Sequence, residues 1–229
     1  MTARLLVLAK APVPGRVKTR LCPPCTPDQA AGIAAAALTD TLASATATAG
    51  TVLALDGRMV APPGVAVRPQ RGGNLGERIA AAFAELSGPL LQIGMDTPQV
   101  TPRLLARCLS ALDDGVDAVL GPAADGGWWA LGLHDPSCAR VLADVPMSTP
   151  DTGRLTARAL RDAGLRVGTL PTLRDVDTWP DAVAVAELAP HGRFAATVAA
   201  VAGVPGVSGA AAAGAAAAAG AGGIAGIAG

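Results

Sequence analysis

The sequence predicts an α/β domain of three layers, with helices on both faces of a mainly parallel β-sheet. The first observation is that short apolar runs, typical of strands, alternate with longer segments of helical pattern. The second is that Arg4–Ala9 and Leu90–Gly94 are almost continuously apolar, as strands buried on both faces are. Asp96 lies two residues after the second run, and ligands of open α/β sheets bind outside the carboxyl ends of the strands.

Composition limits the classes of partner. The chain has 229 residues, and we expect residues 1–202 to form a single domain and 203–229 to be a disordered Ala/Gly-rich tail. Charged residues make up 16% and the formal net charge is zero, which argues against a nucleic-acid binder. The tail is uncharged, but its glycines and its lack of Leu and Phe argue against stable membrane insertion.

The cysteines and the N-terminal segment indicate a compartment. Cys22 and Cys25 have CxxC spacing, but no second pair or His cluster completes a zinc site, so we interpret them as structural or incidental. The apolar run Leu5–Ala9 is too short for the core of a signal peptide. We therefore expect a cytoplasmic protein with reduced thiols.

Two helix starts carry clear signals. Thr26-Pro27-Asp28 combines a cap, a proline at the first helical position and an early acid, and predicts an Ala-rich helix to about Ser44. Asn74, with Glu77 three residues later, forms a capping-box pattern before a second helix. Further helices are expected at residues 102–112, 148–163, 179–189 and 193–202, and further strands at 51–55, 65–68, 117–121, 128–133 and 166–170.

The segment Lys10–Leu21 is a basic loop after the first strand. Its prolines and glycine exclude regular structure, and Arg16, Lys18 and Arg20 alternate along it. Backbone N–H groups and cationic side chains that converge after a strand suit a diphosphate, although a solvated basic loop is the commoner case. The nucleotide-binding residues predicted from this part of the chain are Ala9, Lys10, Gly15, Arg16, Lys18 and Arg20.

A glycine-rich turn precedes the second helix. Gly72, Gly73 and Gly76 allow the close approach of a flat group such as a nucleobase, although a flexible turn into a helix is the simpler interpretation. The nucleotide-binding residues predicted here are Gln70, Gly73 and Gly76.

Acidic turns follow at Asp96 and at Asp175 and Asp177. Asp96 could also be no more than an Asx turn that ends the strand. Together with the basic loop, however, the acidic turns predict that Mg²⁺ or Mn²⁺ bridges the protein to a nucleoside diphosphate, because these ions prefer oxygen ligands and share their shell with phosphates.

Five segments together resemble the DUF2064 proteins of the GT-A glycosyltransferase superfamily, which are akin to nucleotide-diphospho-sugar transferases. The resemblance runs over residues 4 to 190 in the same order. It implies a GT-A fold, Rossmann-like, with Asp96 in place of the metal-binding DxD carboxylate, although Gly94 leaves that motif incomplete. The segments are Leu8–Leu21, Gln70–Arg78, Gly94–Pro98, Asp125–Gly127 and Asp175–Thr178.

The segment Asp175-Val-Asp-Thr178 also resembles the ending of cytidylyl- and guanylyltransferases. The aspartate that matches Asp177 is a metal ligand there, so Asp96 and Asp177 are the metal ligands that the resemblances imply. The loop around Lys18–Leu21 is similar to that of phospholactate guanylyltransferases as well.

Three functions follow from these patterns. The first is a glycosyltransferase with a nucleotide-sugar donor. In it, Asp125 positions or deprotonates an unknown acceptor, and the leaving diphosphate is neutralised by Arg16, Lys18 and Arg20. The second is a nucleotidyltransferase that joins an NTP to a phosphorylated acceptor. The third is a nucleotide-binding module without catalysis. The resemblance to DUF2064 favours the first.

Overall fold

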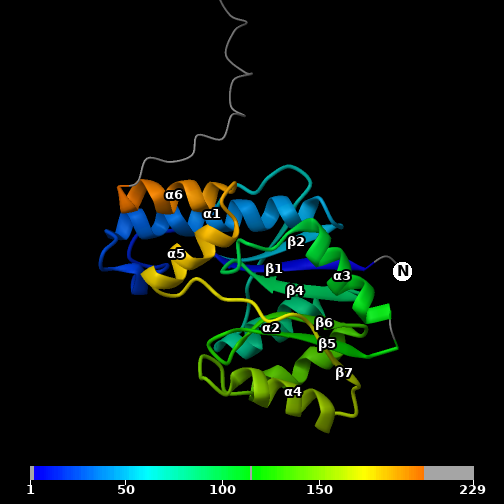
Figure 1. The fold of residues 1–229 in the computed structure, drawn as a ribbon. Coiled ribbons are helices and arrows are strands. Elements are labelled where there is room, and N and C mark those ends of the chain that lie inside the picture. The colour runs from blue at the N-terminus through cyan, green and yellow to red at the C-terminus, as the bar shows by residue number, and fades with distance from the viewer. Residues whose placement is uncertain (1–2, 114, 204–229) are drawn as a thin grey trace, which may run out of the picture.

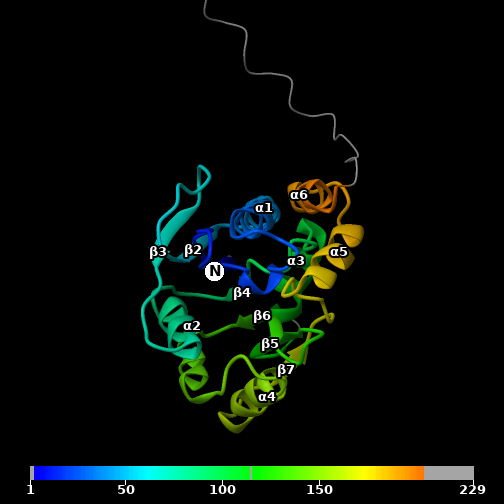
Figure 2. The same ribbon diagram turned by 90° about the vertical axis from the view of Figure 1, so that its left-hand side faces the viewer.

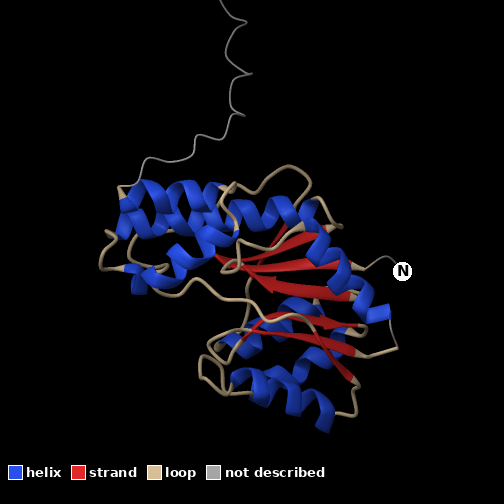
Figure 3. Ribbon diagram, viewed as in Figure 1, coloured by secondary structure: helices blue, strands red, loops and turns tan. Residues whose placement is uncertain are grey.

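The computed structural model describes residues 3–113 and 115–203, so the predicted tail from residue 204 onward lies outside the described residues. Seven strands form one sheet in the order β3-β2-β1-β4-β6-β5-β7 (Figures 1 and 3). The strands are β1 (Arg4–Lys10), β2 (Thr51–Asp56), β3 (Ala66–Pro69), β4 (Leu90–Gly94), β5 (Ala118–Pro122), β6 (Trp128–Leu133) and β7 (Val167–Thr169).

The predicted mainly parallel sheet is confirmed, with one strand as the exception. β1 runs parallel to β2 and β4, β2 to β3, and β5 to β7, whereas β6 is antiparallel to both β4 and β5. A sharp turn at Asp125-Gly126 joins β5 to β6, and the positive φ of Gly126 (90°) allows it. The apolar pattern of residues 128–133 located this strand but carried no information on its direction.

Helices cover both faces of the sheet, as expected (Figure 2). α1 and α3 contribute to the cluster that contains Leu5 and Leu91, on one face, whereas α2, η2 and α4 contribute to the cluster around Leu6 and Leu90, on the other. α5 and α6 pack on α1 through a third cluster. The helices are η1 (Thr19–Leu21), α1 (Pro27–Thr46), α2 (Leu75–Ala84), α3 (Pro102–Asp113), η2 (Pro136–Asp144), α4 (Thr152–Asp162), α5 (Trp179–Leu188) and α6 (Arg193–Ala202).

Local capping explains where the helices begin. The expected cap of α1 is present as a full capping box between Thr26 and Gln29, and Asn74 caps α2 in the same way with Glu77. The predicted start of α4 at Ser148 is wrong, because Ser148 has a left-handed φ of 60° and the helix begins only at Thr152. No helix in residues 3–113 and 115–203 is long and apolar enough to cross a membrane.

Candidate active site

Two cavities adjoin at the carboxyl ends of β1 and β4. The larger, here called the acidic cavity, has a volume of about 620 Å³, and the smaller, the basic cavity, about 310 Å³. Leu8, Leu75 and Asp96 line both cavities, so Asp96 lies where one opens into the other. These volumes lie in the range of small-molecule sites.

The basic cavity brings together most of the residues predicted to bind nucleotide. Besides the three shared residues, it is lined by Ala9, Lys10, Arg16, Val17, Lys18, Asp56, Gln70, Arg78 and Met95. The amide nitrogen of Gln70 donates to the carbonyl oxygens of Ala9 (2.8 Å) and Ala54 (3.0 Å), and so holds the ends of β1 and β2 together beside the cavity. Arg78 pairs with Asp56 at 3.2 Å.

Lys18 connects the basic loop to both acidic turns. Its ammonium lies 2.6 Å from Oδ1 of Asp96 and 3.9 Å from Oδ1 of Asp177, and it also donates to the carbonyl oxygen of Val176. The side chain is 8% exposed, which strengthens these interactions relative to a surface pair. Arg20 pairs with the other oxygen of Asp177 at 3.0 Å and therefore lies at the acidic cavity.

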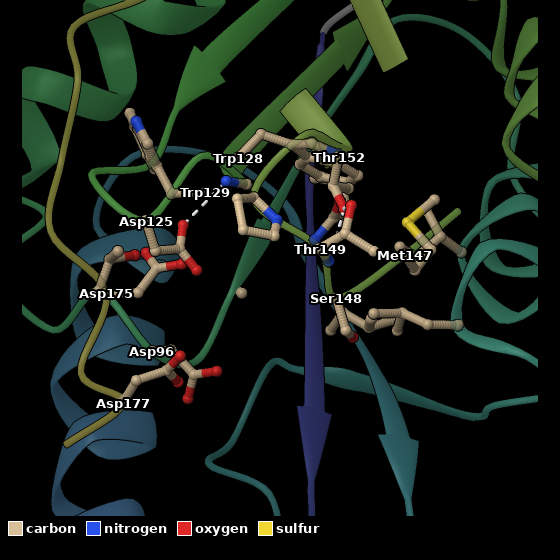
Figure 4. A pocket seen from close by; sticks show the side chains of 18 of the residues that line it. Asp96, Asp125, Trp128, Trp129, Met147, Ser148, Thr149, Thr152, Asp175 and Asp177 are labelled. Carbon is tan, nitrogen blue, oxygen red and sulfur yellow. Dashed lines mark hydrogen bonds between the residues drawn. The ribbon is translucent and has the colours of Figure 1, made fainter. Parts of the chain in front are cut away.

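The acids gather on one side of the acidic cavity. Figure 4 shows Asp96, Asp125, Asp175 and Asp177 there, with Met147 and the residues after it opposite. Burial, and then the charges of Asp96 and Asp125, raise the pKa of Asp175 to about 7. Its buried Oδ1 has no hydrogen-bond partner within the described parts of the chain.

Asp125 is held in place by the turn that it begins. Its Oδ1 accepts a hydrogen bond from the backbone N–H of Gly127 (2.9 Å). Gly126 packs directly on the loop before α4, because a Cβ there would come within 2.0 Å of the carbonyl oxygen of Pro150. The N–H of Gly153 closes this contact by donating to the carbonyl of Gly126 at 2.9 Å. The turn therefore fixes the Asp125 carboxylate at the wall of the cavity.

The two tryptophans of β6, Trp128 and Trp129, differ in burial. Both touch the acidic cavity, but Trp129 is only 2% exposed, and its indole nitrogen donates to the carbonyl of Pro171. Trp129 is therefore part of the core. Trp128 is half-buried, and its indole nitrogen donates to Oγ1 of Thr156, which fixes the ring at the wall of the cavity.

Three predicted glycines line neither cavity. Gly15 takes a left-handed turn (φ 72°) in the basic loop, and the N–H of Gly73 donates to the Glu77 carboxylate that caps α2. Gly76 is buried against η2, where a Cβ would lie 2.1 Å from the carbonyl oxygen of Leu142. The structure thus gives Gly76 a packing role, and its part in a nucleotide site stays a prediction.

The sequence reasoning missed several residues of the site. Gln92 and Thr97 line the acidic cavity, and both are buried. The sequence could have indicated Gln92, since it is the one polar residue in the apolar strand Leu90–Gly94. No sequence pattern indicated the pair of Asp56 and Arg78, because it joins two elements that are separate in the sequence, the end of β2 and α2.

The oxygen atoms around Lys18 form a set that suits a cation. Three oxygens, from Asp96, Val176 and Asp177, surround the ammonium, and oxygen is the ligand type that Mg²⁺ and Mn²⁺ prefer. The unpartnered Oδ1 of Asp175 adds a further oxygen in the same turn. No group of three or more His, Cys, Asp or Glu side chains in residues 3–113 and 115–203 is arranged to hold a metal. One or two carboxylates suffice, however, for a metal that completes its shell with substrate phosphates.

Several solved structures share the fold of this chain. A proposed nucleotide-diphospho-sugar transferase from Desulfovibrio desulfuricans G20 is 26% identical, with a TM-score of 0.73 over 87% of this chain and 97% of that one. Rv0371c from Mycobacterium tuberculosis H37Rv, solved in complex with manganese, is 22% identical, with a TM-score of 0.52 over 82% of this chain and 99% of that one.

A third structure is a CMP:2-keto-3-deoxy-manno-octonic acid synthetase complexed with CTP. It is 14% identical, with a TM-score of 0.52 over 83% of this chain and 99% of that one. These likenesses confirm the nucleotide-diphospho-sugar transferase type of fold.

No curated protein matches the sequence. A family model described as "Uncharacterized protein conserved in bacteria (DUF2064)" matches residues 30–149, which include β4, Asp96 and Asp125. The chain belongs to the DUF2064 family.

Proposed function

We propose that the protein is a glycosyltransferase that takes a nucleotide-diphospho-sugar as donor. The observation that carries the proposal is the junction of the two cavities at Asp96, where a wall rich in cations gives way to a wall rich in carboxylates. A nucleotide sugar has the matching polarity, because its charged diphosphate is joined directly to a sugar rich in hydroxyl groups. The likeness to the Desulfovibrio desulfuricans transferase supports the transferase class.

The donor fits the cavities in one orientation. The diphosphate lies in the basic cavity, where Lys10, Arg16 and Lys18 offer cationic donors, and its sugar extends past Asp96 into the acidic cavity. Lys18 already contacts two carboxylates, so its ammonium exchanges part of that contact for a phosphate oxygen when the donor binds.

The transfer itself needs a base and a stabilised leaving group. An acceptor hydroxyl attacks the anomeric carbon, the bond from that carbon to the diphosphate oxygen breaks, and the hydroxyl proton passes to Asp125. The nucleoside diphosphate leaves with the electron pair, and the cationic side chains of Arg16 and Lys18 stabilise its charge. Asp125 suits this role because the Gly127 N–H fixes its carboxylate at the cavity wall.

A divalent cation fits the same site. Asp96 and Asp177 are the residues that would hold Mg²⁺ or Mn²⁺, and the unpartnered oxygen of Asp175 lies in the same turn. Such an ion neutralises the charge that develops on the leaving diphosphate.

A binding panel tests the proposal. Melting temperatures are measured with nucleoside diphosphates, nucleotide sugars and NTPs, each with and without MgCl₂, since a ligand of the folded state raises the melting temperature. We expect the largest rise with one nucleotide sugar plus metal. A rise with an NTP but with no nucleotide sugar would favour nucleotidyl transfer. Binding of a nucleotide sugar that is never hydrolysed or transferred would favour a module without catalysis.

A further inference from the structure

The charges of the acidic cavity are unbalanced. Among the described residues that line it are four aspartates and one cationic residue, Arg20, which is already paired with Asp177 at 3.0 Å, while the buried Lys18 is paired with Asp96 at 2.6 Å. A metal held by Asp96 and Asp177 would offset those two acids and leave Asp125 and Asp175 facing the cavity. An anion placed beside them meets repulsion that the low dielectric of a partly buried site increases.

Two buried polar residues that line the acidic cavity, Gln92 and Thr97, each have an oxygen atom without a hydrogen-bond partner in the described part of the chain. Gln92 is 3% exposed, and its strand neighbours are Leu6 on β1 and Leu131 on β6, so its amide points from an apolar sheet face into the cavity. Its Oε1 has no hydrogen-bond partner within the described residues. A buried polar group without a partner is destabilising, and a ligand that supplies the missing hydrogen bond removes that cost.

Thr97, in the turn after β4, is the second buried polar residue that lines the acidic cavity. It is 1% exposed, lines the cavity, and its hydroxyl has no partner in residues 3–113 and 115–203. Thr41 in α1 also has a buried hydroxyl that finds no partner among the described residues, but Thr41 lines neither cavity. This difference makes Thr41 a matched control for Thr97.

We propose that the acidic cavity binds an uncharged acceptor that carries several hydroxyl groups, and that it excludes phosphorylated acceptors. The proposal rests on the glycosyltransferase function and names the class of its acceptor. Carboxylates and the Gln92 oxygen accept hydrogen bonds, and hydroxyl groups donate them, whereas a phosphate dianion brings only acceptors and negative charge. The fixed indole of Trp128 gives the carbon face of a polyol or sugar an apolar surface.

Matched pairs of small molecules test this assignment. Binding of glycerol and glycerol 3-phosphate, of glucose and glucose 6-phosphate, and of myo-inositol and its monophosphate is measured by ligand-observed NMR. The protein is held saturated with the nucleoside diphosphate that it binds best. We expect at least one neutral member to bind, and its phosphorylated partner to bind at least about tenfold more weakly.

Two variants test whether the unpartnered groups take part. Thr97→Val and Gln92→Met should each weaken binding of the neutral compound about fivefold or more, because each removes one hydrogen bond to the ligand. Thr41→Val should leave that binding unchanged. All three variants should retain the melting temperature of the wild type or exceed it, since no partnered group is lost. Equal effects of Thr97→Val and Thr41→Val would overturn the assignment.

The outcomes distinguish a wrong acceptor class from a wrong proposed function. If the nucleoside diphosphate binds but the phosphorylated members bind as tightly as the neutral ones, or no neutral member binds, the acceptor class is wrong while the donor site remains. If no nucleoside diphosphate binds to the wild type, the proposed function fails and the acceptor assignment fails with it.

Discussion

The ammonium of Lys18 lies 2.6 Å from Oδ1 of Asp96, at the junction of the basic and acidic cavities. The pair joins the loop after β1 to the turn after β4, two strands that are neighbours in the sheet. One cation is therefore in reach of both the predicted metal ligands and the predicted diphosphate site.

Replacing Lys18 tests its part in nucleotide binding. Lys18→Ala should weaken binding of the nucleoside diphosphate about tenfold, or about 1.4 kcal/mol, because it removes a charge-assisted hydrogen bond to phosphate. Binding of the nucleoside without phosphates should not change. Isothermal titration of both ligands measures the difference. Arg158→Ala removes an exposed cation on α4 that pairs with Asp162 and lines neither cavity, and it serves as the control. Unchanged diphosphate affinity in Lys18→Ala would contradict the assignment.

Asp125→Asn tests the proposed base. Asn can still accept the hydrogen bond from the Gly127 N–H, so the turn should survive while the ability to take a proton is lost. We expect kcat to fall about 10²–10⁴-fold with little change in donor affinity.

The chain contains a matched control for this substitution. Oδ1 of Asp135 accepts a hydrogen bond from the Ser137 N–H at 2.9 Å, the same geometry as at Asp125, but Asp135 lines neither cavity. Asp135→Asn should keep the wild-type kcat. A similar loss of kcat in both variants would show that Asp125 acts through the turn and not as a base.

Gly126 should be far less tolerant of a side chain than Gly164. Both have positive φ (90° and 85°), but a Cβ at Gly126 meets the Pro150 carbonyl at 2.0 Å, whereas nothing lies within 4 Å at Gly164. Gly164→Ala should cost about 1–2 kcal/mol for the backbone conformation alone. Gly126→Ala should cost at least about 1 kcal/mol more, because the loop before α4 must shift. Urea unfolding measures both values, and equal costs would contradict the predicted contact.

The ion pair of Asp117 and Arg166 should make stability depend on acidity. Three hydrogen bonds from the N–H groups of Arg166 lower the pKa of Asp117 to about 2. Because the folded pKa lies below the unfolded value, the pair stabilises the fold above about pH 4 and this contribution is lost as the pH falls towards 2. The difference in unfolding free energy between wild type and Asp117→Asn should therefore be constant from pH 7 to 5 and shrink below pH 4.

Urea unfolding at pH 7, 5, 4 and 3 measures this trend. Asp162→Asn is the control, since Asp162 is 68% exposed and pairs with Arg158 at 3.4 Å within one helix. Such a pair contributes at most about 0.5 kcal/mol. A difference for Asp117→Asn that grows as the pH falls would contradict the assignment.

Much of the fold follows from local patterns in the sequence. β4 and α6 lie at the predicted residues, because an apolar run that stops at Gly94 and a helical segment that starts after Gly192 are set by their own residues. η2 was missed although Asp135-Pro136 is a helix-start signal, with Asp135 as the cap and the proline at the first position.

The arrangement of the site was harder to predict from the sequence, because it depends on contacts between distant segments. The patterns identified Arg16, Lys18, Asp96 and Asp125 as candidate site residues. They did not show that Lys18 contacts Asp96 rather than solvent, since that contact exists only because β1 and β4 are neighbours in the sheet. The same holds for the turn around Gly126, whose partner loop lies before α4.

The most direct test of the central claim is the identity of the phosphorus-containing product. The protein is incubated with MgCl₂, an extract of small metabolites as the source of acceptor, and first a mixture of nucleotide sugars, then a mixture of NTPs, and the products are followed by ³¹P NMR. We expect that a nucleoside diphosphate accumulates from a nucleotide sugar and that Asp125→Asn abolishes its release. Pyrophosphate released from an NTP, with every nucleotide sugar left intact, would contradict it.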